Sequence, residues 1–216
     1  YLDRRLKIGL GVNLVGNTLN SVMSNPFPQL SPRLSVSFAL TDDIDLNANF
    51  GRYAMQPSYT SMGYQAPDGT YPNKMRLRYI MSNQAVLGGE YHLGSYLHFS
   101  AEGFYKSYSS YPISEIEGIS LASKGTEYGQ VGAEAVLSTG EGRAYGAEVV
   151  ARLMPWHQFS ATATYTLFRS EFTDKAGIYR PSSWDTRQML NLLLSYRLGK
   201  SWYLSASWRY SGGAPY

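Results

Sequence analysis

The chain contains no cysteine and no long apolar run among its 216 residues. Without cysteine there are no disulfide bonds and no thiolate metal sites. A membrane-spanning helix needs about 20 consecutive apolar residues. The densest apolar run, MLNLLLSY, is much shorter and contains Asn191. The sequence therefore excludes a helical membrane protein.

The sequence also lacks a basic cluster. Lys and Arg total 19 against 16 Asp and Glu, which gives a formal net charge of +3, and the basic residues are scattered along the chain. Nucleic-acid binding is therefore poorly supported. The N-terminal segment YLDRRLKIGL does not start with Met and lacks the basic, apolar and small-residue succession of a signal peptide. We therefore expect either a mature protein or a segment of a longer one.

Aromatic residues and glycine are abundant, with 19 Tyr, 4 Trp and 21 Gly. At least nine segments alternate between apolar and polar residues. Successive side chains of a strand point to opposite faces, so each segment predicts a strand with one apolar and one polar face. These segments begin near residues 6, 34, 44, 87, 97, 145, 159, 190 and 202. A tenth strand is expected if YGQVGAEAVLS pairs with the segment that starts at Tyr145.

The connections between these segments are of two kinds that alternate along the chain. Short turns are expected near residues 40–44, 93–96, 153–157 and 198–201, and long loops near 15–30, 55–83, 108–142 and 171–184. All short turns then lie at one end of an up-and-down sheet and all long loops at the other. This asymmetry is typical of outer-membrane barrels, which have short periplasmic turns and long extracellular loops. The motif GEGR, Gly140 to Arg143, is too short for a phosphate loop and is interpreted as a tight turn.

The apolar rows face either the core of a soluble closed barrel or lipid, and the opposite rows distinguish the two. These rows mix charged residues with Ser, Thr, Asn and Gly, which suits a wet lumen. Aromatic residues near the strand ends match interfacial girdles. We therefore predict that the apolar rows face lipid. The charged residues predicted to face the lumen are Asp45, Glu90, Glu102, Glu148, Arg152, Arg197 and Arg209.

Candidates for catalysis or metal binding are few. His92 and His98 flank a predicted turn at Gly94 and can approach each other, but no third ligand of suitable spacing accompanies them. The serines are numerous, and none is paired with a recognisable base and orienting group. We therefore expect no catalytic residue, no metal site and no cofactor.

The long loops are better candidates for ligand binding, because aromatic side chains with a polar tip make rigid contacts. The alternative is that these residues belong to the interfacial belt or pack the loops together. The predicted ligand-binding tyrosines are Tyr53, Tyr59, Tyr64, Tyr71, Tyr108 and Tyr111.

Several segments resemble the barrel hairpins of TonB-dependent outer-membrane receptors, most closely those of the Bacteroides group. They are SPRLSVSFALTDDIDLNANFGRYAMQPSY, NQAVLGGEYHLGSYLHFSAEGFYKSYSSYPI, GRAYGAEVVARLMPWHQFSATATYTLFRSEF and the ending WRYSGGAPY. The resemblance covers essentially the whole chain. It implies an all-β, antiparallel up-and-down transmembrane β-barrel, here partial with about nine or ten strands where the family has about 22. Residues 1–216 are then expected to be a barrel segment without the plug domain.

The resemblance implies a receptor and transporter in the outer membrane of a Gram-negative bacterium. Its function would be TonB-energised uptake of a scarce nutrient such as siderophore-iron, cobalamin or a glycan. Its partners would be outer-membrane lipid, the plug domain and the TonB complex, and the lumen carboxylates would pair with the lumen arginines or with the plug. Two alternatives stay open: a small self-contained porin or adhesin barrel, and an outer-membrane barrel enzyme of the lipase or protease type.

Overall fold

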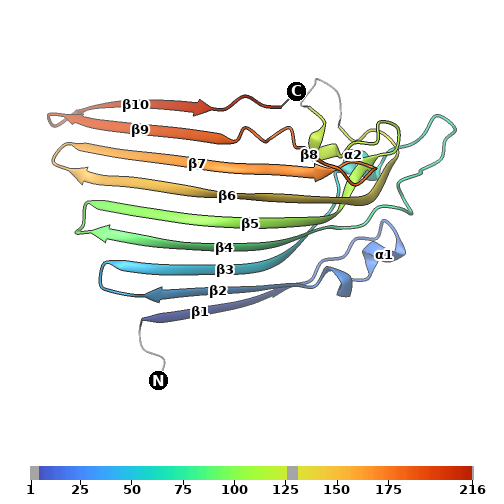
Figure 1. Cartoon of the computed structure of the whole chain (residues 1–216), viewed down its shortest axis with the longest axis horizontal. Helices are drawn as coiled ribbons and strands as arrows, with labels where there is room; N and C mark the ends of the chain where they lie inside the picture. The colour runs from blue at the N-terminus through green and yellow to red at the C-terminus, as the bar shows by residue number, and fades with distance from the viewer. Residues whose placement is uncertain (1–4, 126–130, 216) are drawn as a thin grey trace.

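The computed structural model describes residues 5–125 and 131–215. Its strands form one antiparallel sheet in which sequence neighbours pair in order from β1 to β10, with the short β8 set against β7 (Figure 1). The strands are β1 Leu6–Asn13, β2 Ser31–Ala39, β3 Ile44–Met55, β4 Ile80–Leu93, β5 Leu97–Ser114, β6 Val136–Trp156, β7 Phe159–Thr173, β8 Tyr179–Pro181, β9 Gln188–Leu198 and β10 Trp202–Ser211. The predicted all-β, up-and-down architecture of about ten strands is confirmed.

The helical segments are short and lie in the loops. They are α1 Ser21–Ser24, α2 Tyr59–Met62 and the two 3₁₀ turns Phe27–Gln29 and Leu121–Ser123. Among the described residues, none of these helices has the length and apolarity needed to cross a membrane.

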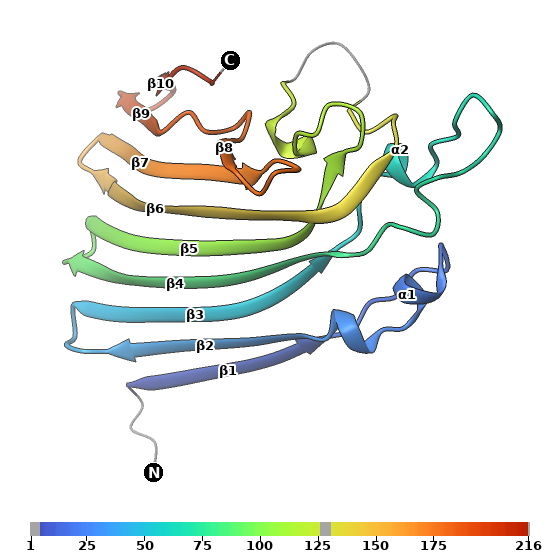
Figure 2. The ribbon, with the colours of Figure 1, turned by 45° about the vertical axis from the view of Figure 1, so that its right-hand side comes forward.

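Short and long connections lie at opposite ends of the sheet, as predicted (Figure 2). The short turns span residues 40–43, 94–96, 157–158 and 199–201, and the long connections span 14–30, 56–79, 115–135 and 174–187. Gly94 and Gly199 sit in two of the short turns with φ values of +58° and +61°, which glycine adopts without strain. We call the end of the sheet that carries the short turns the turn end, and the opposite end the loop end.

Strand length varies across the sheet, from 8 residues in β1 to 21 in β6 and back to 10 in β10. About 9–11 residues suffice for a tilted strand to cross a bilayer. β5 and β6 are therefore longer than one crossing requires, and their additional residues lie at the loop end. Part of the predicted 108–142 loop is consequently strand, because β5 continues to Ser114 and β6 begins at Val136.

The prediction of a tight turn at Gly140 to Arg143 is wrong, because these residues lie inside β6. A Cβ on Gly140 would stand 2.7 Å from the carbonyl oxygen of Tyr111, and one on Gly142 would stand 2.3 Å from the Phe172 ring. The glycines make room for neighbouring strands rather than for a change of direction.

The prediction of a tenth strand in YGQVGAEAVLS is also wrong. Residues 136–138 continue directly into β6 and pair with β5 instead of with the segment from Tyr145. Residues 128–130 of that motif lie outside the described residues. The tenth strand is β8, three residues long and paired with β7.

The strand registers place the seven charged residues of the polar rows on one face of the sheet. Asp45 pairs with Glu90, and Glu102 pairs with Glu148. Arg152 pairs with Thr162 in the same set of rows. We call this surface the charged face and the opposite one the apolar face. That the charged face lines the lumen stays a prediction.

Candidate functional site

The loop end carries its own small core, built from the first two long connections and the starts of β4 and β6. Its buried members come from sequence positions as far apart as 23 and 136, so the loops are packed on one another. They are Met23, Met62, Leu77, Tyr79, Met81 and Val136.

Two buried asparagines fasten these loops. The Asn73 side chain donates to the carbonyl oxygens of Ser61 and Glu134, both at 2.8 Å, and accepts from the backbone N–H of Val136 at 2.9 Å. It thereby joins the connection that precedes β4 to the one that precedes β6. Since the side chain is fully buried, water cannot reach its polar atoms, and these three bonds satisfy them instead.

Asn20 acts in the same way between the first and second long connections. Its side chain donates to the carbonyls of Lys74 and Leu77 at 2.8 and 3.0 Å and caps α1 by accepting from the N–H of Met23 at 2.8 Å. These contacts give the loop end a defined shape.

A cavity of about 420 Å³ opens among these loops, between the ends of β3, β4 and β5. Its lining combines apolar, aromatic, amide and cationic groups, and includes Met55, Gln56, Tyr111, Leu121, Lys124 and Trp184. Apolar walls with a few polar groups are typical of small-molecule sites. We call this space the loop cavity.

Lys124 is the cationic residue in the lining of the loop cavity. Its ammonium donates to Glu117 at 2.8 Å and also to Glu134. Partial burial alone would lower the pKa of Lys124, but hydrogen bonds and Coulomb attraction from the two carboxylates outweigh it and raise the pKa above its ordinary value. The ammonium is therefore held charged and in place beside the cavity.

Of the six predicted tyrosines, Tyr108 and Tyr111 lie together near the end of β5. Both rings contact Phe172, with centroid separations of 5.3 and 4.5 Å. Tyr111 lines the loop cavity, and a register shift of the strand sets it there.

The other four predicted tyrosines do not line the loop cavity. Tyr53 stands on the charged face with the Arg33 guanidinium 4.5 Å from its ring centre. Tyr59 is 78% exposed in α2, and its hydroxyl accepts from Gln56 at 3.4 Å. Tyr64 is half-buried and Tyr71 is exposed, both in the connection between β3 and β4.

Sequence reasoning missed Trp184 and Lys124 as residues of this site. Trp184 is 65% exposed and is an aromatic residue in a long loop, so the criterion used for the tyrosines applied to it equally. Lys124 carries no such signal, because the carboxylates that hold it, Glu117 and Glu134, lie 7 and 10 residues away at no recognisable spacing.

The two histidines meet on the charged face near the turn end. The Nδ1 atoms of His92 and His98 are 3.0 Å apart, and His92 Nε2 lies 3.4 Å from Asp45 and 3.8 Å from Glu90. Because the two nitrogens of His92 point to different partners, the cluster does not converge on one point. Within the described ranges no group of three or more His, Cys, Asp or Glu is arranged to hold a metal ion.

Like charges face each other at the centre of the charged face. Glu102 and Glu148 are directly paired across β5 and β6, an arrangement that is destabilising unless a cation approaches. Glu148 accepts from the Thr166 hydroxyl at 2.7 Å, and Arg209 donates to Asn191 at 2.8 Å. In the part of the chain that the structure describes, none of the predicted arginine–carboxylate pairs forms on this face.

Comparison with known proteins agrees with this architecture. The family model described as TonB dependent receptor-like, beta-barrel, matches residues 1–216. A comparison with curated protein sequences finds no match.

Solved structures share the fold at low sequence identity. The ferric-catecholate import receptor Fiu of E. coli K12 is 12% identical with a TM-score of 0.65, over 98% of this chain and 32% of that one. The alcaligin outer-membrane receptor FauA of Bordetella pertussis is 14% identical with a TM-score of 0.62, over 98% and 35%. The ferripyoverdine receptor of Pseudomonas aeruginosa is 18% identical with a TM-score of 0.59, over 85% and 23%.

The chain thus spans about a third or less of the length of these proteins. With its antiparallel strands, alternating short and long connections and full-length family match, it belongs to the TonB-dependent receptor β-barrels of the Gram-negative outer membrane.

Proposed function

We propose that this chain forms part of the barrel of an outer-membrane receptor that imports a scarce nutrient with energy from TonB. Siderophore-iron, cobalamin and glycans are the candidate nutrients, and the iron chelates named for the similar receptors favour the first. The Bacteroides-group type belongs to the same proposal and rests on motifs such as WRYSGGAPY. A family match over the whole chain favours a receptor over a porin, an adhesin or a lipase.

The observation that carries the proposal is the opposed pair Glu102 and Glu148. Two carboxylates at adjacent positions of a barrel interior need a cation from another element. A plug domain inside the barrel is the partner that the family supplies, and an arginine or lysine of the plug would satisfy both carboxylates. The charged face is in this reading a docking surface for the plug.

The loop cavity is the proposed first contact for the nutrient. Tyr111 and Trp184 offer rigid aromatic surfaces, and the Lys124 ammonium, already paired with Glu117 and Glu134, holds the wall of the cavity in place. The loops that shape the cavity are already fastened by Asn20 and Asn73, so little ordering accompanies binding.

Uptake by whole cells tests the transport proposal. A deletion strain carrying the intact receptor on a plasmid is supplied with labelled ferric siderophores, cobalamin or glycans, with and without functional TonB. We expect accumulation of one class of nutrient that disappears without TonB. Equal accumulation in both backgrounds would identify passive entry and contradict the proposal.

Substitutions test whether the nutrient contacts the loop cavity or another part of the loop end. Trp184→Ala is expected to weaken nutrient binding about tenfold, the effect of removing an aromatic anchor from a binding site. Replacing Tyr64 and Tyr71 by alanine together is the matched control, since neither lines the cavity. Weakening by the double substitution alone would move the contact to the connection between β3 and β4.

A further inference from the structure

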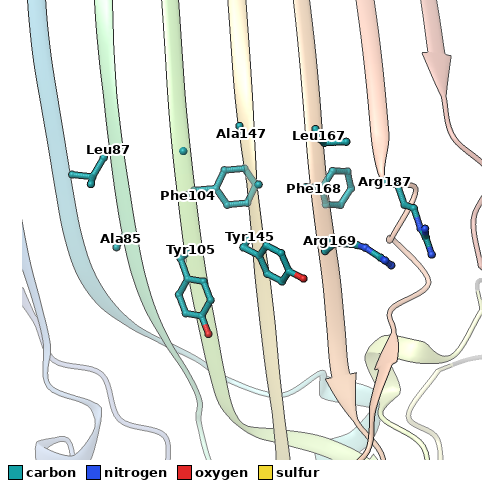
Figure 3. Close-up of a pocket in the computed structure, with 12 residues that line it drawn as sticks. Ala85, Leu87, Phe104, Tyr105, Tyr145, Ala147, Leu167, Phe168, Arg169 and Arg187 are labelled. Atoms are coloured by element: carbon teal, nitrogen blue, oxygen red, sulfur yellow. The ribbon is translucent and has the colours of Figure 1, made fainter.

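A hollow of about 820 Å³ lies on the apolar face, over strands β4 to β7 (Figure 3). One register row crosses it: Leu87 pairs with Gly103, Gly103 with Ala147, and Ala147 with Leu167. Two residues with little or no side chain therefore form its floor, between two leucines.

The hollow is open rather than the result of close packing. Its two leucines stand three strand spacings apart, roughly 14 Å, and Leu87 and Leu167 are 58% and 53% exposed. The nearest atom to a Cβ built on Gly103 is the carbonyl oxygen of Gly146, at 3.8 Å, an ordinary contact. The space above the floor is therefore available to another molecule.

The loop-side end of the hollow is aromatic and cationic. Tyr105 and Tyr145 are paired across β5 and β6 and stack with centroids 6.4 Å apart and planes 24° apart. Arg169 continues their register row, and Arg187 joins it from the connection before β9 (Figure 3).

The two arginines carry more charge than their surroundings neutralise. Arg169 lies 3.5 Å from the buried Asp185, whereas no ion pair involves Arg187 within the residues that the structure describes. The neighbouring Arg143 and Glu171 neutralise each other at 2.8 Å. One positive charge is left at the end of an apolar hollow.

Arg187 also adopts a backbone conformation that is uncommon for residues other than glycine, with φ at +66°. A residue held in such a region is a reason to look for a function of its side chain.

These residues indicate at which depth of the membrane the hollow lies. Tyrosines gather where a barrel crosses the headgroup region, and arginines on an outer surface extend toward it. The aromatic and cationic end of the hollow thus lies at the outer interface, and its apolar floor lies beneath, in the hydrocarbon.

We propose that this hollow binds an acyl chain of a phosphorylated lipid of the outer leaflet, with the phosphate held by Arg187 and Arg169. The guanidinium group binds phosphate oxygens with paired donors, and the leucine-flanked floor takes the chain. The inference rests on the apolar face being the lipid-facing one, and it does not require nutrient transport.

Lipid binding by the intact receptor tests this site. The receptor is purified in mild detergent, stripped of lipid and titrated with bisphosphorylated lipid A or the same lipid without phosphates, and binding is followed by native mass spectrometry. We expect Arg187→Gln to weaken binding of the phosphorylated lipid about tenfold, the effect of losing a charge-assisted hydrogen bond, without changing binding of the other lipid. Arg197→Gln, on the charged face, is the matched control.

Variants that fill the hollow provide a second, independent test of lipid binding. Gly103→Leu is expected to weaken both lipids, and Ala147→Leu replaces it if the first variant fails to assemble. Unchanged binding in Arg187→Gln, equal affinity for the two lipids, or full binding with the hollow filled would each overturn the proposal. Displacement of the lipid by millimolar inorganic phosphate would show a simple anion site and overturn it as well.

Discussion

Substitution of two adjacent leucines in β9 distinguishes the lipid-facing from the lumen-facing surface. Leu192 pairs with Trp208 on the apolar face, and Leu193 pairs with Ser207 on the charged face. Both lie at the centre of the eleven-residue strand β9. Leu192→Arg and Leu193→Arg therefore introduce the same charge at nearly the same depth on opposite faces.

The expected difference is large. An arginine at the midplane of the lipid face costs about 2 to 4 kcal/mol. Since 1.4 kcal/mol is a factor of ten in an equilibrium constant, the fold would be disfavoured about 30-fold to 700-fold. An arginine at Leu193 meets a polar surface formed by Thr162 and Ser207, and its ionic group stays hydrated.

Urea unfolding of the intact receptor in lipid vesicles measures both effects, and the heat-modifiable mobility of the folded barrel in gels reports assembly. We expect Leu192→Arg to lower the free energy of unfolding or to block assembly, and Leu193→Arg to remain close to the parent. Equal losses, or the larger loss at Leu193, would refute the assignment of the faces.

Three further predictions concern the loop end and the charged face. Asn73→Ala leaves the Val136 N–H without a partner and should destabilise the loops by about 1 to 3 kcal/mol, seen as faster hydrogen exchange there; unchanged exchange would contradict the fastening role. The pKa of Asp174 lies below its ordinary 3.8 because it accepts from the Ile178 N–H and from Arg180. Its stabilisation is therefore complete above that value and is lost as pH falls below it. The protection factors of the amides in residues 174–180, which correct for the pH dependence of intrinsic exchange, should therefore fall only under about pH 4, and a fall near neutrality would argue against the assignment. Glu102→Gln should lower the urea concentration at which the plug leaves the barrel, and unaltered release would exclude pairing of this carboxylate with the plug.

The strands were predictable because the membrane imposes a local rule. In a strand that crosses a membrane, successive side chains face two different environments in turn. Apolar rows such as Leu34, Val36 and Phe38 can therefore be recognised without knowledge of the partner strands. The four short turns were predictable for the same reason, since alternation stops where the chain leaves the sheet.

Features that depend on distant contacts were not predictable. Gly140 and Gly142 are typical turn residues in isolation, and only the approach of Tyr111 and Phe172 explains them inside a strand. Likewise, nothing near Asn73 in the sequence indicates that its amide joins two loops. The loop cavity depends on contacts of this kind and could be predicted only as a region rich in tyrosine.

The unequal strand lengths have a consequence for the entropy of recognition. β5 and β6 continue beyond the length that one crossing requires as a hydrogen-bonded ladder, and Tyr108 and Tyr111 project from this ladder rather than from a free loop. Ordering one backbone residue costs about 1 to 2 kcal/mol, and here that ordering is complete before any ligand arrives. Contacts made on the ladder are therefore expected to select by shape, because no ordering cost is left to be met when a ligand binds there.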